Sequence, residues 1–391
     1  MHNTIRTLLC GFALCVALLL PSGSAAGENA IQADRVNAAD LYRQAFGQMP
    51  QFAREAEILN EYATTPIDDA IIEILKQSQE TFSTVAKAND ATWCDWGVLN
   101  QDIFTHIDYL GPTRKLARLM CLEARYLLEQ DQDEAAAKIF ASVLLLGRRI
   151  EQGGPLMCLL VGLNIERIAL EPMAAACHDF NDEAKRTLLH RMDALTERIG
   201  FAEVLTVERK ILVDHLIEIA KNDSNQARDQ IIKIAHEWGG SPVDADKVVQ
   251  EVSGEPAGWI ASLERLRQAF IDVEAIGALP LDEFLQELDK LKQQWSKDTS
   301  LVQMFAPGVI AMARPKLDSA RCATAMLHAG ILFTLEGEKG FERVIDPLTG
   351  KPFLLKKLES NAFHIQSALT DPESRHIHAE ELTLRFGHTG P

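Results

Sequence analysis

Trp93-Cys94-Asp95-Trp96 has the side chains of a binding site. Two indole rings and a carboxylate could stack on a sugar or on a cationic ligand. In the alternative interpretation the tryptophans anchor a loop between helices, and Asp95 caps a helix near Asn100. We favour this structural role, but we keep Trp93, Asp95 and Trp96 as candidate binding residues.

A second candidate group is Asn164, Glu166 and Arg167, which are polar positions in an apolar stretch after Pro155. In a groove, Asn164 and Arg167 would bind a peptide backbone or a carboxylate, so both are candidate binding residues. Such groups more often form an internal Glu–Arg pair or lie at an exposed helix end. We favour these structural roles here too.

Histidines are concentrated near the carboxyl terminus, at His364, His376, His378 and His388. On a strand, His376 and His378 would point to one face, as in a zinc or copper site. The neighbouring Asp371-Pro372-Glu373-Ser374 is typical of a solvated chain end, so we expect no metal. Motif searches find no nucleophile elbow, zinc-protease motif or phosphate-binding glycine loop. We therefore predict no catalytic residue and no cofactor.

The elements that would position these residues are mostly helices. Proline and first-turn acids predict helix starts at Thr65-Pro66-Ile67-Asp68, Gly111-Pro112, Gly154-Pro155, Ser241-Pro242-Val243-Asp244 and Leu279-Pro280. Apolar spacing predicts a helical hairpin over 116–150 and, after Pro155, a helix with almost no polar face that belongs in the middle of the domain. It also predicts amphipathic helices over 182–198, 201–221, 225–238, 243–252, 257–275, 281–296 and 318–335.

The last part of the chain has a different pattern. A cluster of turn formers at 346–352 precedes short strand candidates at 353–358, 363–368 and 381–386. The predicted fold is therefore mainly all-α, an irregular array of antiparallel helical hairpins with a small C-terminal β-hairpin appendage. We divide it into a signal peptide (1–26), a helical domain (27–336) and a β-containing C-terminal segment (337–391).

The first residues indicate export. Arg6, the apolar run from Leu8 to Leu20 and the small residues before Gly27 have the order of a cleavable signal. We therefore expect a periplasmic or extracellular protein with no membrane span after cleavage. The net charge is −17, with acids and bases interleaved, so nucleic acid is not an expected partner.

The cysteines beyond the signal are odd in number and lack metal-site spacing. They are Cys94, Cys121, Cys158, Cys177 and Cys322. We expect them to be small buried hydrophobic residues, with a bridge among Cys121, Cys158 and Cys177 as the alternative. A Cys158–Cys177 bridge is excluded if both lie on one straight helix.

The 116–150 hairpin resembles a single tetratricopeptide hairpin. Ala124, Tyr126, the acidic turn 131–136 and Phe140 occupy matching positions. The tryptophan and the closing proline of that repeat are missing, and no second copy follows, so an irregular array is expected instead of a solenoid.

The mature chain also resembles a group of uncharacterised exported helical proteins of planctomycete-like bacteria. The features that carry this resemblance are Asn37-Ala38-Ala39-Asp40-Leu41-Tyr42-Arg43, Cys94-Asp95-Trp96, the hairpin and the turn 346–353. This turn also looks like one that precedes the terminal strands of some secretion-system pseudopilins. The resemblance implies an envelope protein and supplies no catalytic residues.

We expect an exported binding or assembly protein that recognises an envelope protein or a peptide, because stacked helical hairpins form grooves. The alternative is an envelope hydrolase whose site is assembled from distant residues, with Asp95 or Glu166 beside a histidine in a deep pocket. A passive structural component would have neither a groove nor such a pocket.

Overall fold

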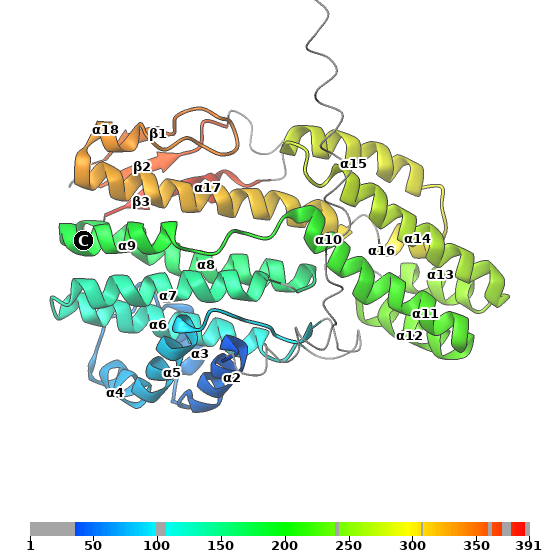
Figure 1. Cartoon of the computed structure of the whole chain (residues 1–391), viewed down its shortest axis with the longest axis horizontal. Helices are drawn as coiled ribbons and strands as arrows, with labels where there is room; N and C mark the ends of the chain where they lie inside the picture. The colour runs from blue at the N-terminus through cyan, green and yellow to red at the C-terminus, as the bar shows by residue number, and fades with distance from the viewer. Residues whose placement is uncertain are drawn as a thin grey trace, which may run out of the picture.

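A computed structural model describes residues 36–98, 107–152, 154–238, 242–305, 308–358, 362–369 and 377–387. The chain is mainly helical and ends in a small antiparallel sheet (Figure 1), which confirms the predicted fold class. Among these residues, no helix has the length and apolarity needed to cross a membrane.

The first part of the chain forms a stack of helices. Its elements are α2 (Ala38–Gln48), α3 (Glu55–Asn60), α4 (Asp69–Gln77), α5 (Gln79–Asp90), α6 (Leu110–Glu129), α7 (Asp133–Glu151), α8 (Leu156–Ala175), the 3-10 turn η2 (Ala176–His178) and α9 (Asp182–Asp193). Helices α6 and α7 are the predicted hairpin. Asp131, with φ of 56°, ends α6 in the left-handed conformation. Helix α8 packs against α6, α7 and α17, which confirms its predicted central place.

A second group of helices lies to the right in Figure 1. It consists of α10 (Phe201–Arg209), the π-helical turn η3 (Lys210–Asp214), α11 (His215–Asn222), α12 (Ser224–Trp238), α13 (Pro242–Val252), α14 (Pro256–Ile276), α15 (Leu281–Trp295) and α16 (Ser300–Phe305). The long helix α17 (Gly308–Glu336) returns to the first group. The short α18 (Glu338–Phe341) follows it.

Some helix starts differ from the predicted ones. Helix α4 begins at Asp69, and the Asp68 carboxylate accepts a hydrogen bond from the Ile71 amide at 2.9 Å. The helix start predicted at Thr65-Pro66 was therefore wrong, because Asp68, the acid expected in the first turn, is itself the cap. Helix α13 begins at Pro242 as predicted, whereas Pro155 is the residue before its helix.

The hydrophobic interior consists of two clusters. The larger one contains buried residues of α2–α9, the later part of α17 and the C-terminal sheet. The smaller one contains residues of α10–α16, the first half of α17 and the start of α8. Helices α8 and α17 therefore contribute to both clusters and join the two helix groups.

The sheet has the order β1-β2-β3, all antiparallel. Its strands are β1 (Leu354–Lys357), β2 (Phe363–Gln366) and β3 (Thr383–Phe386), and the 3-10 turn η5 (Ala379–Leu382) precedes β3. All three strand predictions are confirmed. The rings of Phe363 and Phe386 stack at 4.7 Å, and Phe386 lies over Gly330 of α17, where a Cβ would come within 2.0 Å of the ring. The sheet therefore packs directly on α17.

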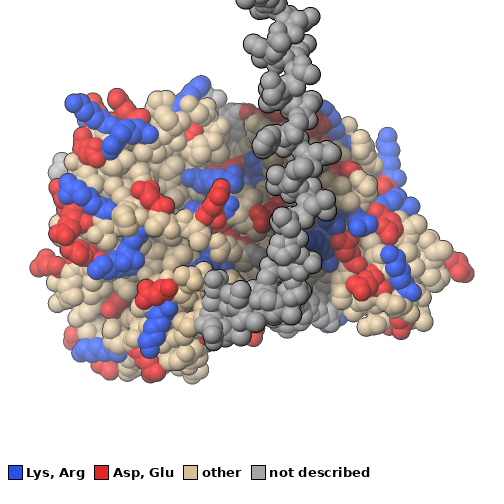
Figure 2. Space-filling model, viewed as in Figure 1, with Lys and Arg blue, Asp and Glu red and all other residues tan. Residues whose placement is uncertain are grey.

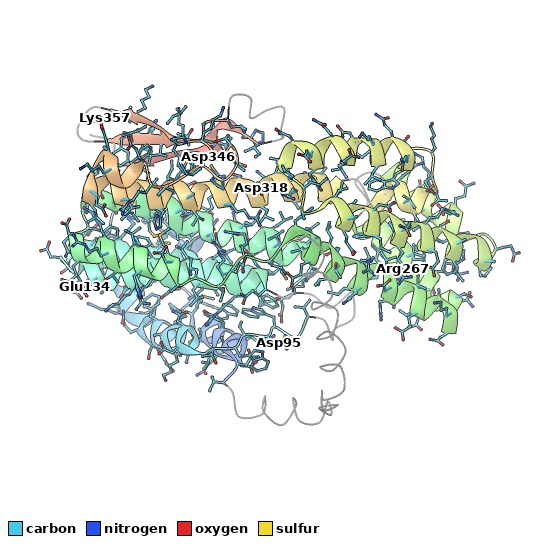
Figure 3. The ribbon with its side chains drawn as sticks, turned by 45° about the horizontal axis from the view of Figure 1, so that its top comes forward. Asp95, Glu134, Arg267, Asp318, Asp346 and Lys357 are labelled. Atoms are coloured by element: carbon cyan, nitrogen blue, oxygen red, sulfur yellow. The ribbon has the colours of Figure 1, made fainter. Side chains whose placement is uncertain are left out.

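The turn formers before the sheet surround one buried carboxylate. Asp346 accepts hydrogen bonds from the Leu348 amide at 2.9 Å and from the Ser367 hydroxyl at 2.6 Å, beside α17 (Figure 3). This gives the 346–352 motif a structural role, because a buried carboxylate needs such donors.

Candidate functional site

The Trp93–Trp96 segment lies between helices and packs against them. Trp96 is buried and stacks on Tyr109 at 4.2 Å and on Tyr42 at 5.9 Å. Its indole nitrogen donates to the Arg149 carbonyl at 2.9 Å. Trp93 is half-buried, and its carbonyl accepts a hydrogen bond from the Ala38 amide.

Asp95 is exposed and lies on the side of the molecule opposite the sheet (Figure 3). Its carboxylate accepts from the Gly97 amide at 2.8 Å, and Asn37 bridges its main chain. The helix near Asn100 that it was expected to cap lies outside the described residues. None of Trp93, Asp95 and Trp96 lines the hollow between α8 and α17 in which Asn164 and Arg167 lie.

Asn164 and Arg167 lie on the exposed face of α8, in a hollow of about 300 Å³ between α8 and α17. The two helices run side by side in the same direction, because their early residues share this hollow and Cys177, just after α8, meets Thr334 late in α17. The lining residues are Leu160, Leu163, Asn164, Arg167, Leu170, Glu171, Lys316, Ser319, Ala320, Ala323, Glu380, Glu381, Thr383 and Leu384. Aliphatic side chains from both helices thus lie beside polar groups.

The charges of this hollow centre on Glu381, whose side chain is only 8% exposed. It pairs with Lys316 and lies 3.7 Å from Arg167, which also pairs with Glu171 at 3.0 Å. Arg167 is 49% exposed and Lys316 is 44% exposed, so both cations remain accessible to a ligand. The Asn164 side chain has no hydrogen bond to any other described residue.

A second hollow, of about 1260 Å³, continues from the first. The two share Glu171, Thr383 and Leu384. The second hollow is lined by the end of α6, the α6–α7 turn, the end of α8 and β3. We call the two together the α8 trough.

Glu166 faces away from the trough into a buried ion cluster. It pairs with Arg148 at 2.5 Å and with Arg198, and Arg198 also pairs with Glu151 at 2.6 Å. Close packing at Gly147 and Gly162 brings α7 and α8 together here, since a Cβ on either glycine would meet the other's carbonyl within 3.0 Å. Burial and the Glu166 charge raise the pKa of Glu151. The expected Glu–Arg pairing thus exists, but its arginines are Arg148 and Arg198 instead of Arg167.

Asp95 and Glu166 were the acids expected beside a histidine in a hydrolase site. Among the described residues, neither has a histidine as a hydrogen-bond or ion-pair partner. Asp95 is bonded to Asn37 and Gly97, and Glu166 to arginines. His364 lies on β2 and His378 just before η5, while His376 and His388 lie outside the described residues. Across the part of the chain that the structure describes, no three His, Cys, Asp or Glu side chains are grouped to hold a metal.

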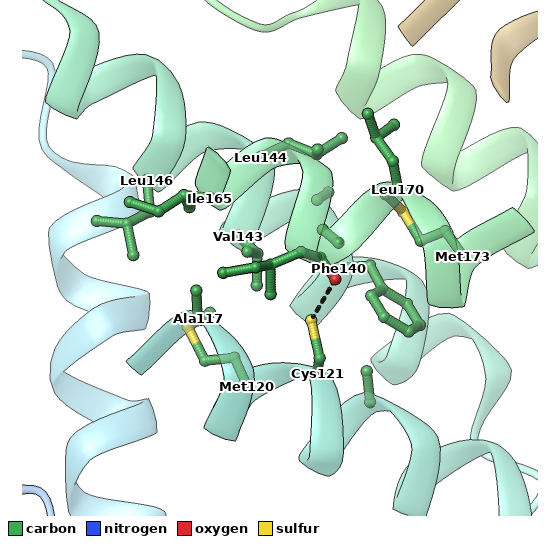
Figure 4. Packing of buried hydrophobic residues seen from close by; sticks show 14 of the residues in the cluster. Ala117, Met120, Cys121, Phe140, Val143, Leu144, Leu146, Ile165, Leu170 and Met173 are labelled. Carbon is green, nitrogen blue, oxygen red and sulfur yellow. Dashed lines mark hydrogen bonds between the residues drawn. The ribbon is translucent and has the colours of Figure 1, made fainter. Parts of the chain in front are cut away.

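The five cysteines that the structure describes are unbridged. The Cys121 thiol lies among apolar side chains and donates to the Ile168 carbonyl at 3.5 Å (Figure 4). Burial raises the pKa of Cys94 to about 12 and that of Cys158 to about 11. Cys121, Cys158, Cys177 and Cys322 are small buried hydrophobic residues, as expected, whereas Cys94 is only half-buried. The alternative bridge among Cys121, Cys158 and Cys177 is not formed.

Comparison with family models, with curated proteins and with solved structures finds no match to this chain.

Proposed function

We propose that this chain is an exported binding protein of the cell envelope, and that it holds an extended peptide segment of a protein partner in the α8 trough. The observation that carries the proposal is the convergence of Asn164 and Arg167 with Lys316 beside aliphatic side chains of α8 and α17. Export is inferred from the signal-like first residues.

The length of the trough suits a peptide. Leu160, Asn164, Arg167, Glu171 and Ala175 follow one face of α8 and line the trough in sequence. At about 1.5 Å per helical residue this face is about 22 Å long. An extended chain rises about 3.3 Å per residue, so about seven residues would fill it.

The chemistry of the lining also suits a peptide. Asn164 offers one acceptor and two donors to a peptide main chain. Leu160, Leu163 and Ala320 provide apolar contacts for side chains. The visible surface has interspersed acids and bases (Figure 2), so a single-sign field does not define the partner there.

Filling the trough tests the proposal. Peptides selected from a random library on the wild-type chain should bind Asn164→Trp at least about tenfold more weakly, because the indole would occupy the trough. Asn164 is exposed, so this change leaves the core intact. The matched control is Lys138→Trp, on the exposed face of α7 and outside the trough. Unchanged binding to Asn164→Trp would refute the proposed function.

A further inference from the structure

We propose that the partner segment is a basic peptide that pairs, as an added strand, with the outer edge of β3. This inference rests on the proposed function and specifies its partner. It is carried by three observations: the position of β3 at the edge of the sheet, the hollow beside that edge, and the charge of the hollow.

The hydrogen-bond pattern of the sheet shows which main-chain groups face outward. The Leu358 amide donates to Ala362 at 2.8 Å on the β1 side, and the Ser367 amide donates to Leu382 at 3.0 Å on the β3 side. Bonded pairs alternate along an antiparallel ladder. In the observed register, β3 therefore bonds to β2 through Leu384 and Phe386.

Arg385 consequently directs its amide and carbonyl away from β2. Within the described residues, no hydrogen bond of its main chain occurs on that outer side. Two positions further on, the Gly387 amide donates to the Ala174 carbonyl of α8 at 3.3 Å. The open edge is therefore short and lies immediately before the contact with α8.

Open space adjoins this edge. The larger hollow of the α8 trough is lined by Leu384, Arg385 and Gly387 on one side and by the α6–α7 turn on the other. An extended chain can thus lie against the Arg385 main chain, as in other cases of strand addition.

The charged residues of the larger hollow indicate which peptide would bind there. The acids of this hollow are Glu129, Asp131, Asp133, Glu171 and Asp179, against the bases Arg125 and Arg385. Arg125 is engaged, since it donates to the Tyr62 and Thr65 carbonyls at 2.6 and 2.8 Å. Of the acids, Glu171 pairs with Arg167 at 3.0 Å and Asp133 accepts from the Asn181 amide at 2.8 Å. The acids of this hollow still outnumber its bases. Lysine or arginine side chains on the added strand would face these acids. A second copy of this chain is a poorer occupant, because it would bring the same acids against each other.

The test uses a fluorescent, acetylated peptide of alternating lysine and valine, with a glutamate–valine peptide as its control. The full exported chain should bind the basic peptide and not the acidic one, and binding should weaken as salt is raised. Arg385→Pro removes the outward amide without removing a β2–β3 bond, and proline is tolerated at sheet edges. It should weaken binding at least about tenfold, whereas Arg385→Ala, which keeps the amide, should bind as tightly as the wild type or more tightly.

Further measurements keep the result interpretable if Arg385→Pro folds poorly. Amide exchange at Arg385 in the wild-type chain should slow when the basic peptide is added. Asp131→Asn, which suits the left-handed conformation, should weaken binding without altering the fold. Failure of the basic peptide to bind, or unchanged exchange at Arg385, would overturn the inference. Sedimentation that reports paired copies instead would also overturn it.

The outcomes separate the two proposals. If library peptides lose binding to Asn164→Trp but bind Arg385→Pro as they bind the wild type, strand addition is refuted and the proposed function stands. If Asn164→Trp binds library peptides as the wild type does, the proposed function itself is refuted.

Discussion

Replacing Arg198 with alanine should destabilise the folded chain by about 3–5 kcal/mol, the usual cost of breaking a buried ion pair. Arg198 is 5% exposed, and its partners Glu151 and Glu166 are 0% and 1% exposed. It supplies a charge-assisted hydrogen bond to each carboxylate, and such bonds contribute about 1.5–3 kcal/mol each. Without it, Arg148 is the cation that remains in the cluster.

The destabilisation should grow with pH. Burial and the neighbouring Glu166 raise the pKa of Glu151 above its ordinary value of 4.5. The folded chain thus keeps a proton that the unfolded chain loses, so stability falls as the pH rises from 4.5 through the folded-state pKa. Arg198 favours the charged form of Glu151. Removing Arg198 raises this pKa further, and the fall in stability becomes steeper.

Urea unfolding at about pH 6 and about pH 9 measures both effects. The control is Arg343→Ala, because Arg343 and its partner Glu336 are 57% and 47% exposed; its cost should stay under about 1 kcal/mol. Adding Glu151→Gln to Arg198→Ala should recover stability at the higher pH. A loss below about 1 kcal/mol for Arg198→Ala, or an equal loss at both pH values, would refute the reasoning.

Three further measurements test the packing. Gly330→Ala should destabilise the fold by about 1–3 kcal/mol through overpacking, because its Cβ would meet the Phe386 ring, and a lower melting temperature would report this. Gly111→Ala, with open space around it, is the control and should be close to neutral. Trp96→Leu should cost about 2–4 kcal/mol in chemical denaturation, since the indole loses its stacking and its hydrogen bond, and a loss near zero would contradict the structural role. At pH 8, a thiol reagent should label Cys94 only slowly until the chain unfolds, because burial raises its pKa to about 12; rapid labelling of the native chain would contradict this.

The secondary structure of this chain was largely predictable, because it depends on local patterns. Apolar residues at helical spacing predicted α6, α7 and α14. Turn formers before alternating apolar residues predicted the three strands. Errors occurred at helix ends, as at Asp68, where one acid can either cap a helix or lie in its first turn.

Tertiary contacts decided the roles of the candidate site residues. The sequence favoured a structural role for Trp96 but left a pocket-lining role open, and only the packing of Tyr42 and Tyr109 against its ring decided between them. The sequence also did not indicate that Lys316 and Glu381 would meet Arg167, since α17 and the C-terminal segment bring them there.

The partners in the buried ion cluster were likewise not predictable from the sequence. Glu151 and Arg198 are 47 residues apart in the chain, and nothing in their local sequence pairs them. Helix periodicity determines which face of α8 is polar, because it depends on residues three or four positions apart. Which partner each polar residue meets depends on how distant helices pack, so only the tertiary structure decided it.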